Sequence, residues 1–449
     1  MFLEEPPQVD RQIGLEVYYT RSSGIGGRIK TQPRDFVVKE VLEDHLESKI
    51  YLRKPPQVSG AGPFTLCMLI KRNRDLLPLL LELSQRLGTT VGRFGFAGFK
   101  DKRAITSQFV TVPAKYFRPP ATLEVKGARL VALGRRETPI RRSTWETNLF
   151  RVAIRHIDIE EPRVRETVHE VHGDLSKRIP NFYGYQRFGT VRRVTDLVGR
   201  EMVKGNFEKA VFLLLCTKGE RDDEQLRRAR DDLLETRDYR RALEAFPRRL
   251  TFERLLLRSL IERPDDFVAA IRRLPIQLRR LFVNAYQSYL FNRMLSARIQ
   301  RKLPVGKPTI GDFVLKLSPT GDPVNVGIVG NSNLEEACKE VEAGSHAVAL
   351  PLVGFASRLS EGEQGGIERE VLKQEGVSPN GFYIPALQEC SNEGSFRPIA
   401  VTPSHFSHEV RSEGKKPVVL FRFKLPKGSY ATILLREFMK PRDPISAGF

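Results

Sequence analysis

A short basic loop around Asp101 carries residue types that could act on a sugar or a base. Asp101 stands between Lys100 and Lys102 in the run RFGFAGFKDKRAITSQFVTV. Nearby positive charge favours the ionised form of a carboxyl group, which is the form that a nucleophile or a general base needs. An aspartate in a solvated basic loop would show the same pattern, so these residues alone leave a catalytic role and a surface role open.

A second segment combines aromatic rings with amide and guanidinium groups. The run NFYGYQRFG, residues 181–189, offers planar ring faces on which bases can stack. Asn181 and Gln186 could read base edges, and Arg187 could hold a phosphate. A corner of an aromatic core is the alternative interpretation, and spacing alone does not separate the two.

Basic residues outnumber acidic ones throughout the chain. The 74 Lys and Arg residues against 54 Asp and Glu residues give a net charge of +20, which favours a polyanionic partner such as nucleic acid. Near the end of the chain, Lys424, Lys427 and Arg436 could follow a phosphate backbone, or could form a solvated face. The arginines of the helical stretches could contact RNA, or could form solvated i,i+4 ion pairs with Asp and Glu; they are Arg227, Arg228, Arg240 and Arg241.

Metal, cofactor and membrane functions find no support in the sequence. The four cysteines are far apart, with no C-x-x-C pair, so we expect no metal site and no disulfide framework. The glycines at 24–27 lead into a strand and not into a helix, which argues against a nucleotide loop or a methyltransferase. No segment approaches 18 uninterrupted apolar residues, so we expect a cytoplasmic protein without membrane contact and without a small-molecule cofactor.

The hydrophobic pattern predicts an α+β first domain at residues 1–195. Strands are expected at 36–38, 64–70, 106–113, 122–133 and 148–159, with a helix between Asp75 and Gly88 and another from Glu160. Helical spacing predominates from 195 to 296, and Gly- and Pro-rich sequence predicts short strands joined by turns at 300–395. The last segment returns to a strand that could rejoin the first sheet. We therefore expect an inserted domain at 196–395 and a core-completing segment at 396–449.

Five ordered motifs resemble the TruD family of tRNA pseudouridine synthases. They are G-x-I-K-x-x-P-x-D-F at 27–36, A-G-F-K-D-K-R-A-I-T-S-Q at 97–108, N-F-Y-G-Y-Q-R-F-G at 181–189, A-Y-Q-S-Y at 285–289 and L-P-K-G-S-Y-A-T at 425–432. The resemblance implies a pseudouridine synthase core with a mixed, largely antiparallel sheet, and a family-specific inserted α/β domain. It also implies isomerisation of a uridine of transfer RNA, in the D arm at position 13, without metal or cofactor and without an obligate protein partner.

The resemblance also implies roles for individual residues. The catalytic aspartate of the family falls on Asp101, and its active-site asparagine and aromatic residue fall on Asn181 and Tyr183, where many members have Phe in place of Tyr. We expect Lys100, or another basic residue nearby, to keep Asp101 charged. The remaining residues expected to bind substrate are Gln108, Lys30, Phe36, Gln186 and Arg187. The competing hypothesis is a non-catalytic RNA-binding or ribosome-assembly protein on the same scaffold.

Overall fold

The structure, a computed structural model, describes residues 5–42, 44–50, 60–189, 192–219, 222–318, 321–414 and 416–449. The chain divides into two compact units. The sheet unit consists of Thr20–Ile179, Ser318–Asp322 and Val401–Phe449. The insert unit consists of Met1–Tyr19, Pro180–Leu317 and Pro323–Ala400. The expected limits at 195/196 and 395/396 differ from these, because 180–195 and the first 19 residues group with the insert unit.

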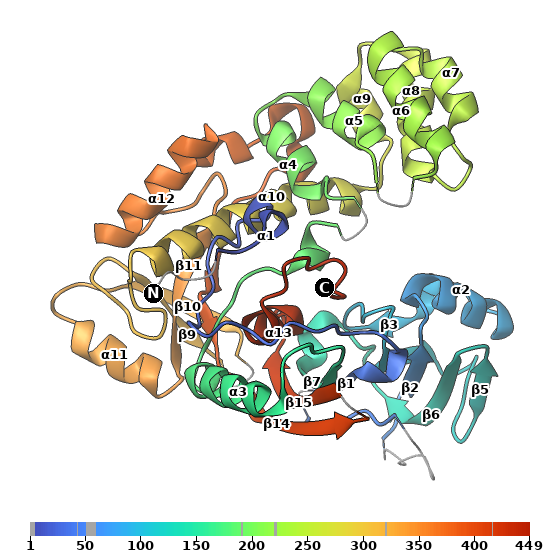
Figure 1. The fold of residues 1–449 in the computed structure, drawn as a ribbon. Coiled ribbons are helices and arrows are strands. Elements are labelled where there is room, and N and C mark those ends of the chain that lie inside the picture. Colours follow the sequence, from blue (N-terminus) through green and yellow to red (C-terminus); the bar gives the residue numbers. More distant parts are fainter. Residues whose placement is uncertain are drawn as a thin grey trace. The chain divides into compact units, whose positions relative to one another are not determined.

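The sheet unit is built on one nine-stranded sheet (Figure 1). Its strand order is β14-β15-β7-β1-β4-β2-β6-β5, and β3 pairs with β4 beside this path. Only the β1–β4 pair of the described sheet is parallel, so the sheet is mixed and largely antiparallel, as expected. The strands are β1 (Phe36–Leu42), β2 (Phe64–Arg72), β3 (Gly95–Phe96), β4 (Ile105–Pro113), β5 (Thr122–Val125), β6 (Ala128–Arg136), β7 (Trp145–Ile154), β14 (Ser404–Glu413) and β15 (Lys416–Pro426).

The end of the chain completes this sheet. Strand β15 pairs with β7 from Val419↔Ile154 to Pro426↔Thr147, and β14 pairs with β15. The expectation that a terminal strand rejoins the first domain is therefore confirmed. The run 122–133, expected as one strand, forms β5 and β6, because the chain turns at Gly127 with a φ of +74° that favours glycine.

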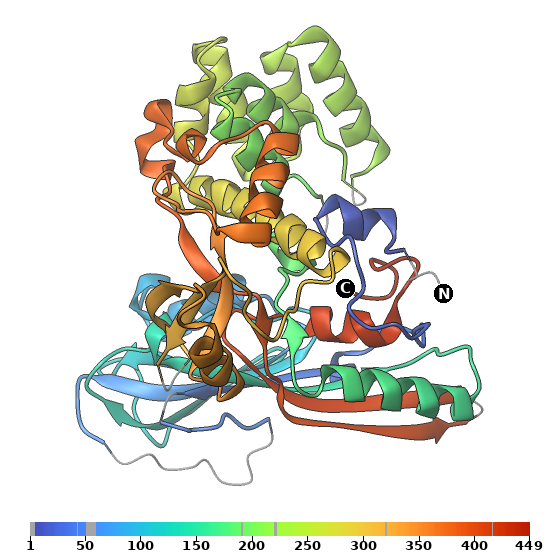
Figure 2. The ribbon, with the colours of Figure 1, turned by 90° about the vertical axis from the view of Figure 1, so that its left-hand side faces the viewer.

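Helices pack on the sheet through apolar faces. Helix α2 (Leu76–Arg86) follows Asp75 at its N-cap, as predicted, and its buried leucines join a core cluster with Cys67 and Val110. Helices α3 (Glu161–Leu175) and α13 (Ala431–Met439) lie beside β14 and β15 (Figures 1 and 2). The ring of Phe438 in α13 lies 4.5 Å from that of Phe421 in β15. Short 3-10 turns are η1 (Pro33–Asp35), η2 (Val91–Arg93) and η3 (Arg142–Thr144).

The insert unit combines helices with a small sheet of order β10-β9-β11-β12. Its helices are α1 (Gln8–Gln12), α4 (Thr195–Val203), α5 (Phe207–Cys216), α6 (Glu224–Thr236), α7 (Tyr239–Ala245), α8 (Thr251–Glu262), α9 (Phe267–Arg272), α10 (Ile276–Gln300), α11 (Leu334–Glu342) and α12 (Gly362–Glu375). Its strands and 3-10 turns are β9 (Phe313–Leu317), β10 (Pro323–Ile328), β11 (His346–Leu352), β12 (Ser395–Pro398), η4 (Tyr185–Arg187), η5 (Pro379–Phe382) and η6 (Pro385–Cys390). The strands β8 (Ile179–Pro180) and β13 (Ala400–Val401) lie where the chain passes from one unit to the other.

The helices expected from 195 to 296 are confirmed. The expectation of short strands joined by turns at 300–395 was incomplete. Helices α11 and α12 interrupt its short strands. Helix α11 begins with Glu335 and Glu336, which favour a helix N-terminus, and buries Ala337 and Val341 four residues apart. The surrounding turn residues concealed this short amphipathic pattern. Among the described residues, no helix combines the length and the apolar character required to cross a membrane.

A fully buried ion pair connects α10 to Asp312 in the insert unit. Arg298, near the end of α10, donates from both terminal nitrogens to the carboxylate of Asp312, at 2.7 and 2.8 Å. Both side chains are 0% exposed. Arg298 also donates to the carbonyl of Pro304, and Thr309 donates to Asp312 from its backbone N–H. Because neither charge contacts water, each depends on the other for compensation.

We predict that Arg298→Met lowers the free energy of unfolding by about 3–5 kcal/mol, since Asp312 would remain buried without its cation. The measurement is the urea midpoint of the full chain, followed by circular dichroism. The control is Arg301→Met, three residues further along, which removes a half-exposed pair with Glu370 and should cost about 0–1 kcal/mol. Equal midpoints for the two variants would contradict the assigned role of the buried pair.

Candidate active site

Lys30 is the cation that lies beside Asp101. Its Nζ is 3.0 Å from Oδ1 of Asp101, and the two side chains are 8% and 27% exposed. The same ammonium group lies 4.6 Å from the ring centre of Phe36. Lys30 has a φ of +56°, a left-handed conformation that is unfavourable for a residue with a Cβ. Strained residues are enriched at functional sites, and here the strain accompanies contact with the candidate catalytic carboxylate.

Lys100, the sequence neighbour of Asp101, points elsewhere. Its Nζ lies 2.9 Å from Oε1 of Glu40 and donates to Oδ1 of Asn148 at 2.9 Å. Glu40 in turn accepts the backbone N–H of Phe109. Of the two expectations for the charge beside Asp101, Lys100 or another basic residue nearby, the structure shows the second, with Lys30 in this place. Lys100 is buried, must satisfy its charge, and does so at the buried Glu40.

Lys71 holds the backbone of the same loop. Its side chain is fully buried, and Nζ donates to the carbonyl oxygens of Lys100 and Asp101 at 3.2 and 2.6 Å. Burial lowers the pKa of Lys71 from 10.5 to about 8, against the opposing effect of the Asp101 charge. No motif singled out Lys71, because a lysine at the end of an apolar strand resembles an ordinary solvated residue in the sequence.

Gln108 also binds the loop from the sheet. Its Nε2 donates to the carbonyl of Gly98 at 3.2 Å, and the side chain is fully buried. The residues that fix the loop therefore come from the adjacent strands β7, β1, β4 and β2, in that order. They are Asn148, Glu40, Gln108 and Lys71. Gln108 thus positions the loop, and direct binding of substrate by it stays a prediction.

Phe36 belongs to an aromatic stack on the same face of the sheet. Its ring meets the ring of Phe150 edge-on at 6.1 Å, and Phe150 stacks on Phe423 at 5.2 Å. Phe36 is 1% exposed. Its ring therefore supports Lys30 in this structure, and substrate contact by Phe36 stays a prediction.

Asn181 and Tyr183 lie in the insert unit, around Arg397. The Asn181 amide accepts a hydrogen bond from Arg397 Nη2 at 2.7 Å and donates to the carbonyl of Pro398 at 3.0 Å. The guanidinium carbon of Arg397 lies 4.0 Å from the ring centre of Tyr183. Arg397 was missed by the sequence interpretation, since it stands more than 200 residues along the chain with no motif around it.

The remaining residues of the aromatic segment differ in exposure. Gln186 is exposed, so its amide is accessible to a ligand. Arg187 donates to Ser288 Oγ at 2.9 Å and to the carbonyl of Asn284 at 3.2 Å, and its guanidinium lies 5.5 Å from the ring centre of Tyr183. Arg187 therefore joins the segment to α10, which the sequence did not indicate.

The structure thus brings together Asp101, Lys30, Phe36, Lys100 and Gln108 within the sheet unit. Asn181, Tyr183, Gln186 and Arg187 form a second set within the insert unit. The joint action of the two sets on one substrate stays a prediction. Among the described residues, no group of three His, Cys, Asp or Glu side chains is placed to hold a metal ion.

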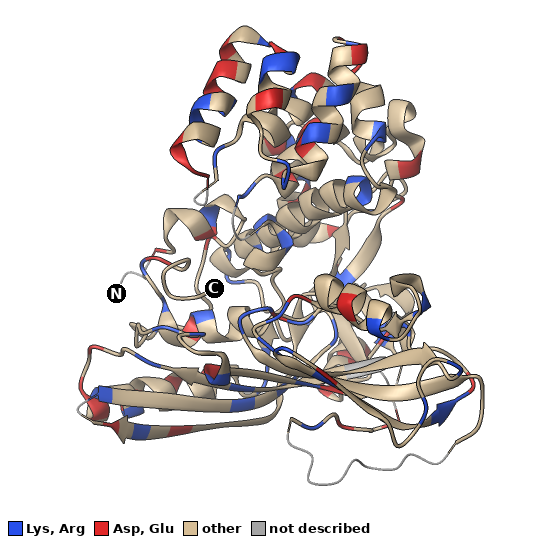
Figure 3. Ribbon diagram, turned by 90° about the vertical axis from the view of Figure 1, so that its right-hand side faces the viewer, with Lys and Arg blue, Asp and Glu red and all other residues tan. Residues whose placement is uncertain are grey.

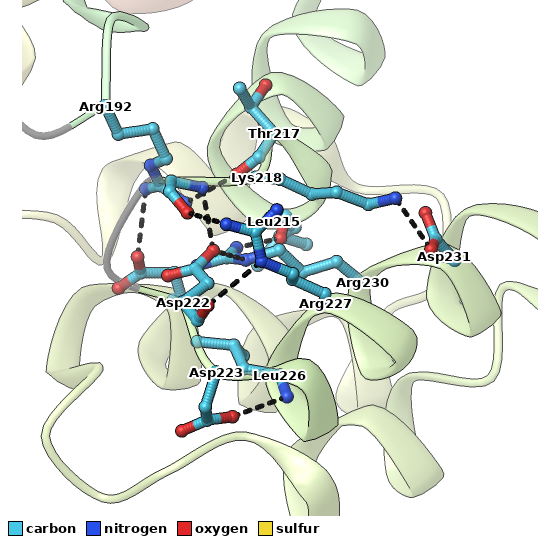
Figure 4. A network of polar contacts seen from close by, with 12 residues as sticks. Arg192, Leu215, Thr217, Lys218, Asp222, Asp223, Leu226, Arg227, Arg230 and Asp231 are labelled. Atoms are coloured by element: carbon cyan, nitrogen blue, oxygen red, sulfur yellow. Dashed lines mark hydrogen bonds and ion pairs between the residues drawn. The ribbon is translucent and has the colours of Figure 1, made fainter.

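Arginines of the helical insert serve largely to hold its own loops (Figure 4). The buried Arg230 donates to Asp222 at 2.8 Å, and Arg227 donates to the carbonyls of Asp222 and Gly219. Arg192 donates to the carbonyl of Thr217. Both signs of charge alternate along these helices in Figure 3.

The ion-pair alternative is therefore realised for two of the arginines considered as RNA contacts. Arg228 pairs with Glu224 at 3.1 Å, and Arg241 pairs with Asp232 at 3.2 Å. Of the lysines and arginines near the end of the chain, Lys427 pairs with Asp322, and Arg436 is buried beside Glu437. Lys424 differs from both, because its side chain lies on the sheet and is half-buried.

We predict that kcat/KM on an RNA substrate falls as the pH rises through about 8, because deprotonated Lys71 no longer places a positive charge behind the Asp101 loop. Lys71→Gln should lower kcat/KM and abolish this alkaline limb, since the amide can donate but does not titrate. Lys102→Gln is the control, because Lys102 is exposed and pairs with Asp75. An unchanged alkaline limb in Lys71→Gln would assign the limb to another group.

Comparisons with known proteins agree with this architecture. The family model described as tRNA pseudouridine synthase D (TruD) matches residues 12–438. A "Probable tRNA pseudouridine synthase D" of Methanococcoides burtonii is 33% identical over 441 residues, which cover 97% of this chain and 98% of that protein. A protein of the same name from Methanopyrus kandleri is 38% identical over 396 residues, covering 86% and 89% of the two chains.

A solved structure shows the same fold. The crystal structure of the "Putative tRNA pseudouridine synthase D (TruD)" from Methanosarcina mazei superposes with a TM-score of 0.82 at 32% identity. The match covers 99% of this chain and 100% of that one. Motif order, a largely antiparallel sheet completed by the end of the chain and near-complete coverage all agree. The chain therefore belongs to the TruD family of tRNA pseudouridine synthases.

Proposed function

We propose that this protein isomerises a uridine in the D arm of transfer RNA, at position 13, to pseudouridine, with Asp101 as the catalytic residue. The reaction breaks the glycosidic bond, turns the base and joins it to the sugar again through carbon. Both roles open to Asp101, attack on the sugar and abstraction of a proton, require an ionised carboxylate. Family membership supports the reaction class, and the position within the tRNA is the finer part of the proposal.

One observation carries the assignment of Asp101. Its carboxylate is partly exposed and paired with the almost buried Lys30 at 3.0 Å, while Lys71 binds its own carbonyl oxygen. A surface aspartate in a solvated basic loop would not have a backbone fixed by buried side chains. The loop thus presents a carboxylate that is paired with a cation and preorganised by a fixed backbone, as transition-state stabilisation demands.

The substrate base must leave its stack before a side chain can reach the glycosidic bond. We assign Tyr183 and Asn181 to the extruded uracil, because an aromatic ring can stack on a base and an amide can bind its edge. The contacts of Arg397 with both side chains support this assignment, since they fix the two groups in one orientation. Tyr183 is 8% exposed, so stacking requires movement of a neighbouring side chain.

The competing function is RNA binding without catalysis on the same scaffold. The buried supports of the Asp101 loop favour the catalytic function, because RNA binding alone has no need of a preorganised carboxylate. An assay for pseudouridine separates the two. Unmodified tRNA is incubated with the protein, and carbodiimide labelling with primer extension then locates any modified position. No pseudouridine in any tRNA would support the non-catalytic alternative.

We predict that Asp101→Asn lowers the rate of pseudouridine formation by at least ~10³ while tRNA affinity stays within several-fold, because the carboxylate takes part in bond breaking and adds little to RNA binding. Asp75→Asn is the matched control, since Asp75 is an exposed carboxylate paired with Lys102. Activity above a tenth of the wild-type rate in Asp101→Asn would remove Asp101 from the mechanism.

A tRNA with cytidine at position 13 should remain unmodified, and pseudouridine elsewhere in that tRNA would refute the proposed position.

A further inference from the structure

The face of the sheet opposite the Asp101 loop carries its own ordered set of side chains. Successive residues of a strand point to opposite faces, so Glu40, Asn148 and Phe150 share the face of the loop, and their neighbours lie on the other face. Cross-strand pairing aligns these neighbours. Val37 pairs with Arg151, and Arg151 pairs with Arg422.

A second row runs parallel to the first. Lys39 pairs with Leu149, and Leu149 pairs with Lys424. The two rows cross strands β1, β7 and β15, and together they place four basic side chains beside Val37 and Leu149. Because neighbouring strands are about 4.8 Å apart, each row extends over roughly 10 Å.

The two rows line a hollow of about 690 Å³, all within the sheet unit. Its basic residues are Lys39, Lys49, Arg151, Arg422 and Lys424, and Glu47 is its acidic residue. Glu47 pairs with Lys39. Among the described residues, no acidic group lies within ion-pair distance of Lys49, Arg422 or Lys424. We call this hollow the rear groove.

The arrangement of its arginines is unfavourable for the free protein. Arg151 and Arg422 are exposed and directly opposite each other, and like charges in this position destabilise a sheet. Within the part of the chain that the structure describes, the Arg151 side chain makes one long hydrogen bond, of 3.5 Å, to the carbonyl of Arg34. A bound anion would remove this repulsion. Phosphodiester groups fit the cations, and bases fit the apolar residues and guanidinium planes between them.

The rear groove reaches the edge of the sheet. Ser407 in β14 pairs with Arg422 and lines the groove together with His405. Strand β14 is the last strand of the sheet order, so the groove extends to an edge of the sheet. The opposite side of β14 is occupied by α3, where the rings of His172 and Phe406 lie 4.4 Å apart.

We propose that the rear groove binds a single-stranded segment of the substrate RNA, apart from the nucleotide on which Asp101 acts. The phosphates lie along Arg151, Arg422 and Lys424, and at least one base lies on the partly exposed Leu149. The proposal rests on the proposed function only in taking tRNA as the substrate. The rear groove contributes to the affinity for RNA, so its residues are binding residues and not catalytic ones.

The test compares two double variants that each remove two positive charges. Arg151→Gln with Arg422→Gln alters the rear groove. Arg86→Gln with Lys126→Gln is the control, because both residues are exposed and lie outside the groove. Affinity for unmodified tRNA is measured as a function of salt concentration. Loss of two phosphate contacts should reduce the slope of log K against log salt by about 1.5, and weaken binding roughly tenfold at physiological salt.

Further measurements separate the groove from the reaction and from general anion binding. The rear-groove variant should keep the wild-type kcat and show a raised KM for tRNA. It should also bind a twelve-nucleotide oligo(A) more weakly than the control variant does, although this RNA contains no uridine. Equal salt slopes for tRNA in the two variants would overturn the proposal. An equally large loss of affinity for inorganic polyphosphate would also overturn it, since the groove would then bind any polyanion. Pseudouridine formation is scored separately, so a failure of the proposed function would remain distinguishable.

Discussion

The position of the Asp101 loop depends on buried polar groups that have no access to water. Lysine, glutamate and amide side chains at the centre of an apolar sheet are costly unless each finds a hydrogen-bond or charge partner. Here the partners are one another and the carbonyl oxygens of the loop, from Gly98 to Asp101. The loop cannot move without leaving several buried groups unsatisfied. Rigid placement of the carboxylate therefore follows from a desolvation penalty, and not from direct contacts of the carboxylate alone.

This dependence explains which parts of the site could be predicted from the sequence. The position of Asp101 was predictable, because glycines, lysines and the aspartate form one contiguous motif. Its cation was not. Lys30 stands 71 residues earlier in the sequence, while the adjacent Lys100 turns towards the buried Glu40. Neighbours in an extended loop point to opposite sides, so proximity in sequence was a poor guide to proximity of charge.

The fold was predictable where the hydrophobic period was regular over a whole element. Strand β2 and helix α2 have such patterns, and both formed within a few residues of the expected limits. Prediction failed where a short amphipathic pattern was surrounded by turn residues, as in α11, and where one alternating run contained a turn, as at Gly127. Arg397 illustrates a different failure. Its role depends on packing against Tyr183 from a distant strand, and no local pattern encodes such a contact.

Alternate residues of a strand point to opposite faces of the sheet, so the two faces of the central strands carry different side chains. On the loop face, the side chains of Lys71, Lys100 and Glu40 are buried and find hydrogen-bond or charge partners within the protein. On the opposite face, the exposed Arg151 of β7 and Arg422 of β15 lie directly opposite each other. Internal partners hold the Asp101 loop in place, whereas like charges on the opposite face repel each other. A shift of β7 by one residue against its neighbours would exchange Asn148 for Leu149 and remove both properties together.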